Sequence, residues 1–291
     1  MHPAPSVILF TVLSGLGFGL LGFLALGVGA LSGWGAFAAW GLGAGLAVAG
    51  LTASTFHLGN PQRALLAFTQ WRTSWLSREA WAAVLTLMVL APAGLGDWLG
   101  FPVPTVLRVA GAAGCVATVV CTAMIYASLR SIPRWHWWIT PVLFLAFAAT
   151  GGMILAVGGP LAALMALVLA GLLVWTFAAG DRRFAAAGSD MGSATGLGRI
   201  GTVRVFEQPH TGGNYLTREM IHVVGRRHAG RLRVLAVALA GLGPALVLLA
   251  VPGLAGQALA AALHVAGAFA ARWLFFAEAE HVVGLYYGAR G

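Results

Sequence analysis

The sequence contains no lysine and few charged residues of any kind. Charged residues make up 9% of the 291 positions, and apolar residues make up 59%. A soluble globular chain has about a quarter of its residues charged, so this composition excludes an ordinary soluble enzyme. The apolar runs are continuous rather than alternating, which argues against a membrane barrel of strands. The chain is therefore predicted to be an integral membrane protein.

Cysteine is nearly absent as well. Cys115 and Cys121 lie six positions apart in one apolar run, so they face different directions on a helix and are not expected to form a disulfide. Two cysteines cannot hold an iron–sulfur cluster, which needs four ligands. We predict no metal site in this chain, and any iron–sulfur cluster is expected in a partner subunit.

Eight apolar runs are long enough to cross a bilayer, which takes a helix of about 20 residues. We therefore predict an all-α integral membrane fold, an eight-transmembrane-helix bundle that forms a single anchor domain over residues 1–291. The last run is the longest and is expected to extend beyond the hydrocarbon core of the bilayer. The predicted spans are 7–31, 35–56, 80–99, 104–129, 138–158, 160–180, 231–252 and 256–286.

The basic residues, all arginines, are distributed unequally between the two sides. Eight spans put both chain ends and the second, fourth and sixth loops on one side, and these segments hold fifteen of the 17 arginines. The opposite loops hold none, and Arg108 and Arg272 lie within spans. By the positive-inside rule, both termini and the long loop 181–230 are predicted to face the cytoplasm. A protein partner that binds basic loops is an alternative cause of the bias.

The long loop 181–230 has two parts. Its first half is rich in glycine and serine, which favours a flexible chain. Its second half predicts a basic amphipathic helix that begins near Asn214. Such a helix next to a span usually lies on the membrane surface, and docking of a soluble subunit is a second role open to it.

Polar side chains gather between the second and third runs. His57 ends the second run and Glu79 opens the third, so the connection brings both to one depth at the cytoplasmic interface. Quinone reduction needs a donor that polarises a carbonyl and a titratable group that passes protons, and histidine and a partly buried glutamate suit these tasks. We interpret His57 and Glu79 as a candidate quinone site, with Trp71 and Trp75 able to pack on the ring.

The same segment also has a structural explanation. Glu79 would then pair with Arg78 or Arg63, and His57 would cap a helix end. Ser77 is a candidate cap at the start of the third helix. The sequence alone leaves both explanations open.

Two ionisable residues lie deep in the last run. Arg272 is costly in a membrane and therefore a functional candidate, with its partner on another helix or in a quinone oxygen. His264, near mid-membrane, is a candidate to ligate a haem b, to relay protons or to hydrogen-bond a backbone carbonyl. Bis-histidine ligation needs a second histidine at similar depth, and none is evident. Glu278, at the cytoplasmic end of the same run, is expected near His57.

Four motifs carry a family resemblance: HLGNPQRA at 57–64, SWLSREAW at 74–81, SIPRWHWWITP at 131–141 and AGAFAARWLFF at 266–276. In these motifs the chain resembles the membrane anchor subunit of dimethyl sulfoxide reductase-type molybdenum complexes. The resemblance implies eight helices that hold a molybdopterin catalytic subunit and a four-cluster iron–sulfur subunit at the bacterial inner membrane, and that exchange electrons with quinone. The family's quinol-site histidine and glutamate fall on His57 and Glu79, and Arg63, Arg78 and Trp75 lie in the same motifs.

Two departures point to a sister complex. The arginine bias puts the predicted site in the cytoplasm, whereas the dimethyl sulfoxide reductase anchor presents it to the periplasm. The segments HTGGNYLTREM at 210–220 and RWLFFAEAEHVVGLYYG at 272–288 look more like the anchor of the cytoplasmic sulfite-oxidising complex. This resemblance implies electron flow from sulfite through the partner subunits to ubiquinone or menaquinone, with no substrate chemistry in the chain itself.

Two other functions stay open. The first is a quinol-oxidising anchor of a dimethyl sulfoxide-type reductase, in which electrons flow the other way. The second is a transporter or a purely structural anchor. A transporter should show acidic or broken-helix motifs at mid-membrane, whereas the deep ionisable residues here are Arg272 and His264.

Overall fold

The computed structural model describes residues 3–56, 60–207, 212 and 228–287. Over these residues the chain is helical and contains no strand. Eight of its helices are long and apolar enough to cross a membrane. The predicted all-α membrane bundle of eight spans is therefore confirmed.

The first six spans are single helices, and the seventh is interrupted by a π-helical turn. The spans are α1 (Pro5–Ala25), α2 (Gly33–Thr55), α3 (Trp75–Leu99), α4 (Thr105–Ala127), α5 (Ile139–Ala156), α6 (Gly159–Gly180), the continuous α9 (Ala229–Val237), η4 (Ala238–Leu242) and α10 (Gly243–Ala250), and α11 (Gly253–Ala277). Short elements outside the spans are η1 (Pro61–Phe68), α7 (Arg183–Ala186), α8 (Met191–Thr195) and η5 (Val282–Tyr287).

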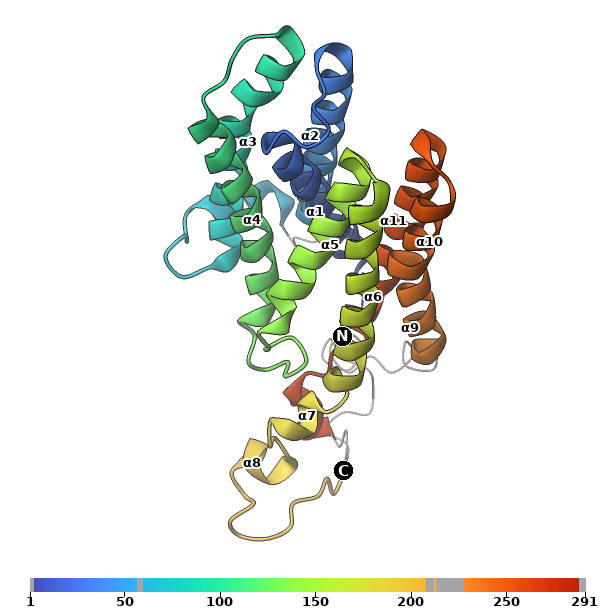
Figure 1. Ribbon diagram of the computed structural model, residues 1–291. Coiled ribbons are helices and arrows are strands. Elements are labelled where there is room, and N and C mark those ends of the chain that lie inside the picture. The colour runs from blue at the N-terminus through green and yellow to red at the C-terminus, as the bar shows by residue number, and fades with distance from the viewer. Residues whose placement is uncertain (1–2, 57–59, 208–211, 213–227, 288–291) are drawn as a thin grey trace.

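Helices α1 and α5 are the most buried and form the centre of the bundle. Helix α1 packs on α2, α4, α5 and α11. Helices α3 and α4 lie to one side of this centre and α9 and α10 to the other (Figure 1). Helices α7 and α8 lie beyond the end of the bundle at which α4 passes into α5 (Figure 1).

Glycines allow the central helices to approach closely. A Cβ atom at Gly17 of α1 would collide with the backbone of Ala47 in α2, and one at Gly152 of α5 would collide with the backbone of Gly19 in α1. Small residues at such crossings let membrane helices make close van der Waals contact. This contact matters in a membrane because the hydrophobic effect does not drive helices together in lipid.

Several of the predicted helix boundaries are wrong. Helix α3 begins at Trp75, five residues before the predicted span, so Glu79 lies inside the helix rather than at its opening. The N-cap position is Ser74, and Ser77 is buried within the helix instead of capping it. Helix α11 ends at Ala277 with 25 residues, before the predicted end of the span, and Glu278 at its C-cap contacts arginines of two other elements.

The arginine count needs one adjustment. The count assigns Arg231 and Arg233 to the sixth loop, although the predicted seventh span begins at 231, and the structure places both in the first turns of α9. They lie at the same end of the span as that loop, so the inequality between the two sides is unchanged. The predicted amphipathic helix from Asn214 lies outside the described residues.

Candidate functional site

Glu79 is a buried carboxylate within a membrane span. Its side chain is 3% exposed, and its Oε1 accepts a hydrogen bond of 2.5 Å from the Thr122 hydroxyl of α4. No arginine pairs with Glu79 among the described residues. Burying a carboxylate with only a neutral partner raises the free energy of the folded protein, unless the carboxyl group is protonated or binds another molecule. The position of Glu79 therefore points to a function rather than to a contribution to stability.

The neighbouring Arg78 points away from Glu79. Its guanidinium donates to the carbonyls of Trp71 and Arg72, at 3.0 and 2.7 Å, and lies 4.4 Å from the centre of the Trp75 ring. The suggested pairing of Glu79 with Arg78 is therefore wrong. Arg63 lies on the exposed η1 and does not pair with Glu79 either.

An open hollow lies beside the start of α3, and its volume is about 600 Å³. Phe68, Trp71 and Trp81 give it mostly aromatic walls, and Thr69 and Arg78 complete the lining. The Trp81 indole donates to the Phe68 carbonyl at 3.0 Å and so fixes one wall. A planar, partly polar ring fits such a hollow, because it can stack on the aromatic faces while Arg78 supplies a donor.

Arg272 lies deep in α11 and is 3% exposed. Its guanidinium carbon lies 3.4 Å from the centre of the Phe144 ring and 5.3 Å from that of Phe147. Cation–π contacts of this kind are worth about 2 kcal/mol when desolvated, which is less than the cost of burying the charge. Among the described residues, no carboxylate forms an ion pair with Arg272.

His264 is buried at the middle of α11, with 1% exposure. Its Nδ1 lies 2.8 Å from the Ala240 carbonyl in the π-helical turn η4, so Nδ1 carries the proton and donates it. Its Nε2 is buried and has no hydrogen-bond partner among the described residues. Of the three roles left open for His264, the hydrogen bond to a backbone carbonyl is therefore present, and it involves one ring nitrogen only.

A haem does not fit at His264. A Cβ atom on Gly151 would lie 3.0 Å from Nε2, and the cavity beside that nitrogen has a volume of only about 10 Å³. The part of the chain that the structure describes also contains no cluster of three or more histidine, cysteine, aspartate or glutamate side chains that could hold a metal ion.

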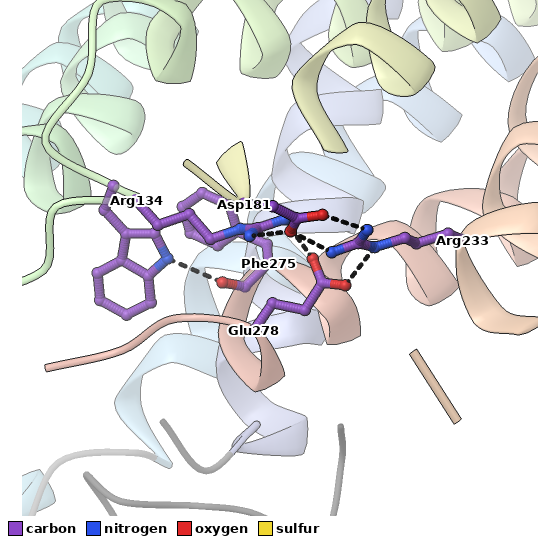
Figure 2. A network of polar contacts seen from close by, with 6 residues as sticks. Arg134, Asp181, Arg233, Phe275 and Glu278 are labelled. Atoms are coloured by element: carbon purple, nitrogen blue, oxygen red, sulfur yellow. Dashed lines mark hydrogen bonds and ion pairs between the residues drawn. The ribbon is translucent and has the colours of Figure 1, made fainter. Parts of the chain in front are cut away.

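Glu278 takes part in an ionic cluster formed by Arg134, Asp181, Arg233 and Glu278. Figure 2 shows the two arginines approaching the two carboxylates from opposite sides. Arg134 bonds Glu278 at 2.5 Å and Asp181 at 2.9 Å. Arg233 bonds Glu278 at 2.6 Å and Asp181 at 2.5 Å. The cluster ties the α4–α5 loop to the ends of α6, α9 and α11, and its formal charges cancel.

The Arg134 loop is held by a second contact. The Trp135 indole donates to the Phe275 carbonyl at 2.8 Å and stacks on the Phe275 ring with centroids 5.1 Å apart. The motif at 131–141 therefore has a structural use in this chain, because two of its side chains fasten the loop to the end of α11.

Sequence reasoning missed two sets of polar contacts. Thr122 is hidden in an apolar run, although its spacing of four from Thr118 puts both hydroxyls on one face of α4. Asp97 and Arg108 flank the short loop between α3 and α4 and form an ion pair, and the Trp40 indole donates to Asp97 at 3.0 Å. Opposite charges on both sides of a short loop are the signal that could have revealed this pair.

The predicted site residues fall into two groups. Glu79, Arg272 and His264 lie inside the bundle, and Thr122, the partner of Glu79, lines the same cavity as the other two. The second group, at the surface or half-buried near the start of α3, consists of Arg63, Trp75 and Arg78. His57 lies outside the described residues, and its expected proximity to Glu278 stays a prediction.

Comparison with known proteins identifies the family. The chain matches the family model for "DMSO reductase anchor subunit (DmsC)" over residues 1–176. It is 35% identical over 326 aligned positions to a protein of Allochromatium vinosum named as a subunit of sulfite dehydrogenase, and the match covers 99% of each chain. No solved structure matches the chain. The protein is therefore a multi-pass membrane protein of the DMSO reductase anchor subunit family, an anchor for the catalytic and other subunits of a molybdoenzyme complex.

Proposed function

We propose that this anchor passes electrons from sulfite oxidation to a membrane quinone, either ubiquinone or menaquinone. Sulfite and water give sulfate, two protons and two electrons in the molybdopterin subunit. The electrons cross the iron–sulfur subunit, and quinone takes up two electrons and two protons to become quinol. The 35% identical relative, whose name is that of a sulfite dehydrogenase subunit, supports this direction.

The observation that carries the proposal is the buried carboxyl group of Glu79, which has no ionic partner among the described residues, at the start of α3. The hollow there offers aromatic walls and the Arg78 guanidinium to the quinone ring, whereas the Glu79 side chain lies on the side of α3 that packs against α4, where it bonds Thr122. In the proposed site, Glu79 and His57 serve the two quinone oxygens, with Glu79 passing a proton. Arg63 and Trp75 lie in the same motifs, and Trp75 packs against the Arg78 guanidinium.

The partner subunits are proposed to dock on the cytoplasmic face. Exposed side chains that follow α8 favour this arrangement: Ile200 is 85% exposed and Phe206 is 94% exposed. Arg199 and Arg204 lie in the same exposed segment. A surface that combines exposed apolar side chains with arginines is typical of a protein interface. The arginine bias supports the same face, on the inner side of a bacterial inner membrane.

The test is the Glu79→Gln variant of the complete complex in membranes, with sulfite as donor and a short-chain ubiquinone as acceptor. The glutamine side chain keeps the size of the glutamate but cannot release a proton. We expect quinone-dependent turnover to fall about 100-fold or more, and we expect His57→Ala to give a loss of similar size. Sulfite oxidation with ferricyanide, which bypasses the membrane, should stay unchanged.

The matched control is Asp97→Asn, the same carboxylate-to-amide change at the other end of α3, in a partly exposed ion pair. It should leave both activities intact. Normal quinone reduction by the Glu79→Gln complex would reject the site and leave the chain a structural anchor.

The second candidate is a quinol-oxidising reductase anchor, which the name of the matched family favours. Assays of one purified complex separate the two directions. The proposal predicts sulfite-dependent quinone reduction and no reduction of dimethyl sulfoxide with a viologen donor. The reverse pattern would establish the reductase.

A further inference from the structure

Two small cavities meet at Arg272 inside the bundle. The first, lined by Thr122, His264 and Arg272, has a volume of about 10 Å³. The second, lined by Thr176, Arg272 and Glu278, offers about 40 Å³. A single bound water needs about 10–15 Å³, so the first cavity is close to the size of one water and the second has room for two or three.

Each cavity is bordered by a buried polar atom that lacks a hydrogen-bond partner among the described residues. In the first cavity this atom is Nε2 of His264, and in the second it is Oγ1 of Thr176. Leaving a buried polar atom without a hydrogen-bond partner destabilises the folded protein. Water bound in a polar cavity removes that cost when two to four polar groups surround it.

The chemistry of the lining groups suits water. The Nδ1 atom of His264 donates to the Ala240 carbonyl, so in the neutral ring Nε2 is an acceptor. The Arg272 guanidinium borders both cavities and has no carboxylate partner in the described part of the chain. A water between Arg272 and His264 therefore receives a hydrogen bond from the first and donates one to the second.

Taken together, the linings of the two cavities extend from groups at the end of the bundle to the partner of Glu79. The larger cavity reaches Arg134 and Glu278 of the ionic cluster. The smaller one reaches Thr122, whose hydroxyl bonds Glu79 at 2.5 Å. Arg272 lines both cavities and marks the boundary between them.

We propose that bound waters in these cavities form a proton path from the ionic cluster, past Arg272, to Thr122 and Glu79, and that the single water of the smaller cavity also donates a hydrogen bond to Nε2 of His264. A proton enters beside Glu278, moves along the waters held by Thr176 and Arg272, and reaches the Glu79 carboxylate when the Thr122 hydroxyl accepts one proton and donates another. Arg272 keeps its own protons and positions the water. The path rests on the proposed function, because it resupplies Glu79 after a proton has left for quinone.

The first experiment detects the water without any quinone. The complete complex, with ¹⁵N-labelled histidine in the anchor, is reconstituted in lipid and studied by magic-angle-spinning NMR. The His264 signal is assigned by its loss in His264→Gln. We expect magnetisation to pass from water protons to Nε2 of His264. A His264 signal that receives none would overturn the path.

The second experiment measures turnover with sulfite and a short-chain ubiquinone. Thr176→Val and Thr122→Val remove one hydroxyl each and preserve shape. Thr118→Val is the matched control, because its hydroxyl is buried and bonds the Gly114 carbonyl at 2.9 Å but lines neither cavity. We expect kcat to fall about tenfold or more in both test variants, with an unchanged KM for quinone and an unaffected control.

The outcomes separate the two proposals. Test variants with the same kcat as Thr118→Val would overturn the path, even if quinone reduction by the wild type is normal. A wild-type complex that does not reduce quinone would refute the proposed function, whereas the water contact at His264 is read in the same sample without quinone.

Discussion

Among the described residues, ionisable side chains have oppositely charged partners in the ionic cluster but not in the bundle interior. In the cluster, Arg134 and Arg233 share Asp181 and Glu278, so each charge meets an opposite charge. In the interior, the described contacts of Glu79 are with a threonine hydroxyl, and those of the Arg272 guanidinium are with aromatic rings. Both regions contain buried ionisable groups, Glu278 in the first and Glu79 and Arg272 in the second, but in the described part of the chain only the first region pairs them with opposite charges.

The difference distinguishes structural from functional polar groups. A matched cluster fastens four chain segments at the end of the bundle, and breaking it leaves charges without partners. An unmatched group in a membrane contributes little stability, and its persistence favours a function. The following predictions test whether the two regions respond to mutation in these opposite ways.

Glu278→Ala should produce the largest loss of stability. The change leaves Arg134 and Arg233 with Asp181 alone, and removing one partner from a buried ionic group costs about 3 kcal/mol. Thermal unfolding of the purified complex in detergent measures the effect. Unfolding at the wild-type temperature would show that the cluster does not hold these segments together.

Arg272→Met should have the opposite effect on stability. Methionine preserves much of the volume against Phe144 and removes an uncompensated charge, so we expect a gain of about 1–2 kcal/mol. Quinone-dependent turnover should fall in the same protein. A variant that unfolds more easily than wild type would contradict the view that Arg272 is kept for function.

Asp181 gives the cluster a dependence on pH. Hydrogen bonds from Arg233 lower the pKa of Asp181 below its ordinary value of 3.8, with a further contribution from Arg134. A lowered pKa in the folded protein means that the stabilisation is complete above the ordinary pKa and is lost as the pH falls through the lowered value. Because Asp181 is about half exposed, the effect should be about 1 kcal/mol or less.

The measurement compares unfolding temperatures of wild type and Asp181→Asn from pH 7 to pH 3. The wild type should be more stable at pH 7, and the two curves should converge at the acidic end. A difference that persists unchanged to pH 3 would show that ionisation of Asp181 is not its cause.

Arg108→Met should have the smallest effect. The pair of Arg108 and Asp97 is partly exposed, each side chain by 21%, and exposed pairs are worth about 0–1 kcal/mol. Thermal unfolding should therefore shift much less than in Glu278→Ala. A shift as large as that of Glu278→Ala would show that the partly exposed ion pair stabilises the protein as much as the ionic cluster at the other end of the bundle does.

The number of spans and their approximate positions could be predicted from the sequence, because about 20 continuous apolar residues are enough to identify a membrane helix. The ends of the helices are less predictable. The apolar pattern predicts that the last helix continues through Glu278, but the contacts of that residue with Arg134 and Arg233 are tertiary and leave no periodic pattern in the sequence.

The candidate site was predictable in part. Glu79 and Arg272 are conspicuous in the sequence because charges are rare in apolar runs. The direction of Arg78 and the partnership of Glu79 with Thr122 depend on how α3 and α4 pack, which spacing along one helix does not determine. The buried Thr176 hydroxyl, without a partner among the described residues, is a packing result of the same kind.

The most direct test of the central claim is photolabelling of the complete complex in membranes with an azidoquinone, followed by peptide mass spectrometry. The account predicts label within residues 56–81, at the start of α3, and competition by unlabelled ubiquinone. Competed label confined to residues 26–32 or 100–104, the loops at the opposite end of the bundle, would contradict it.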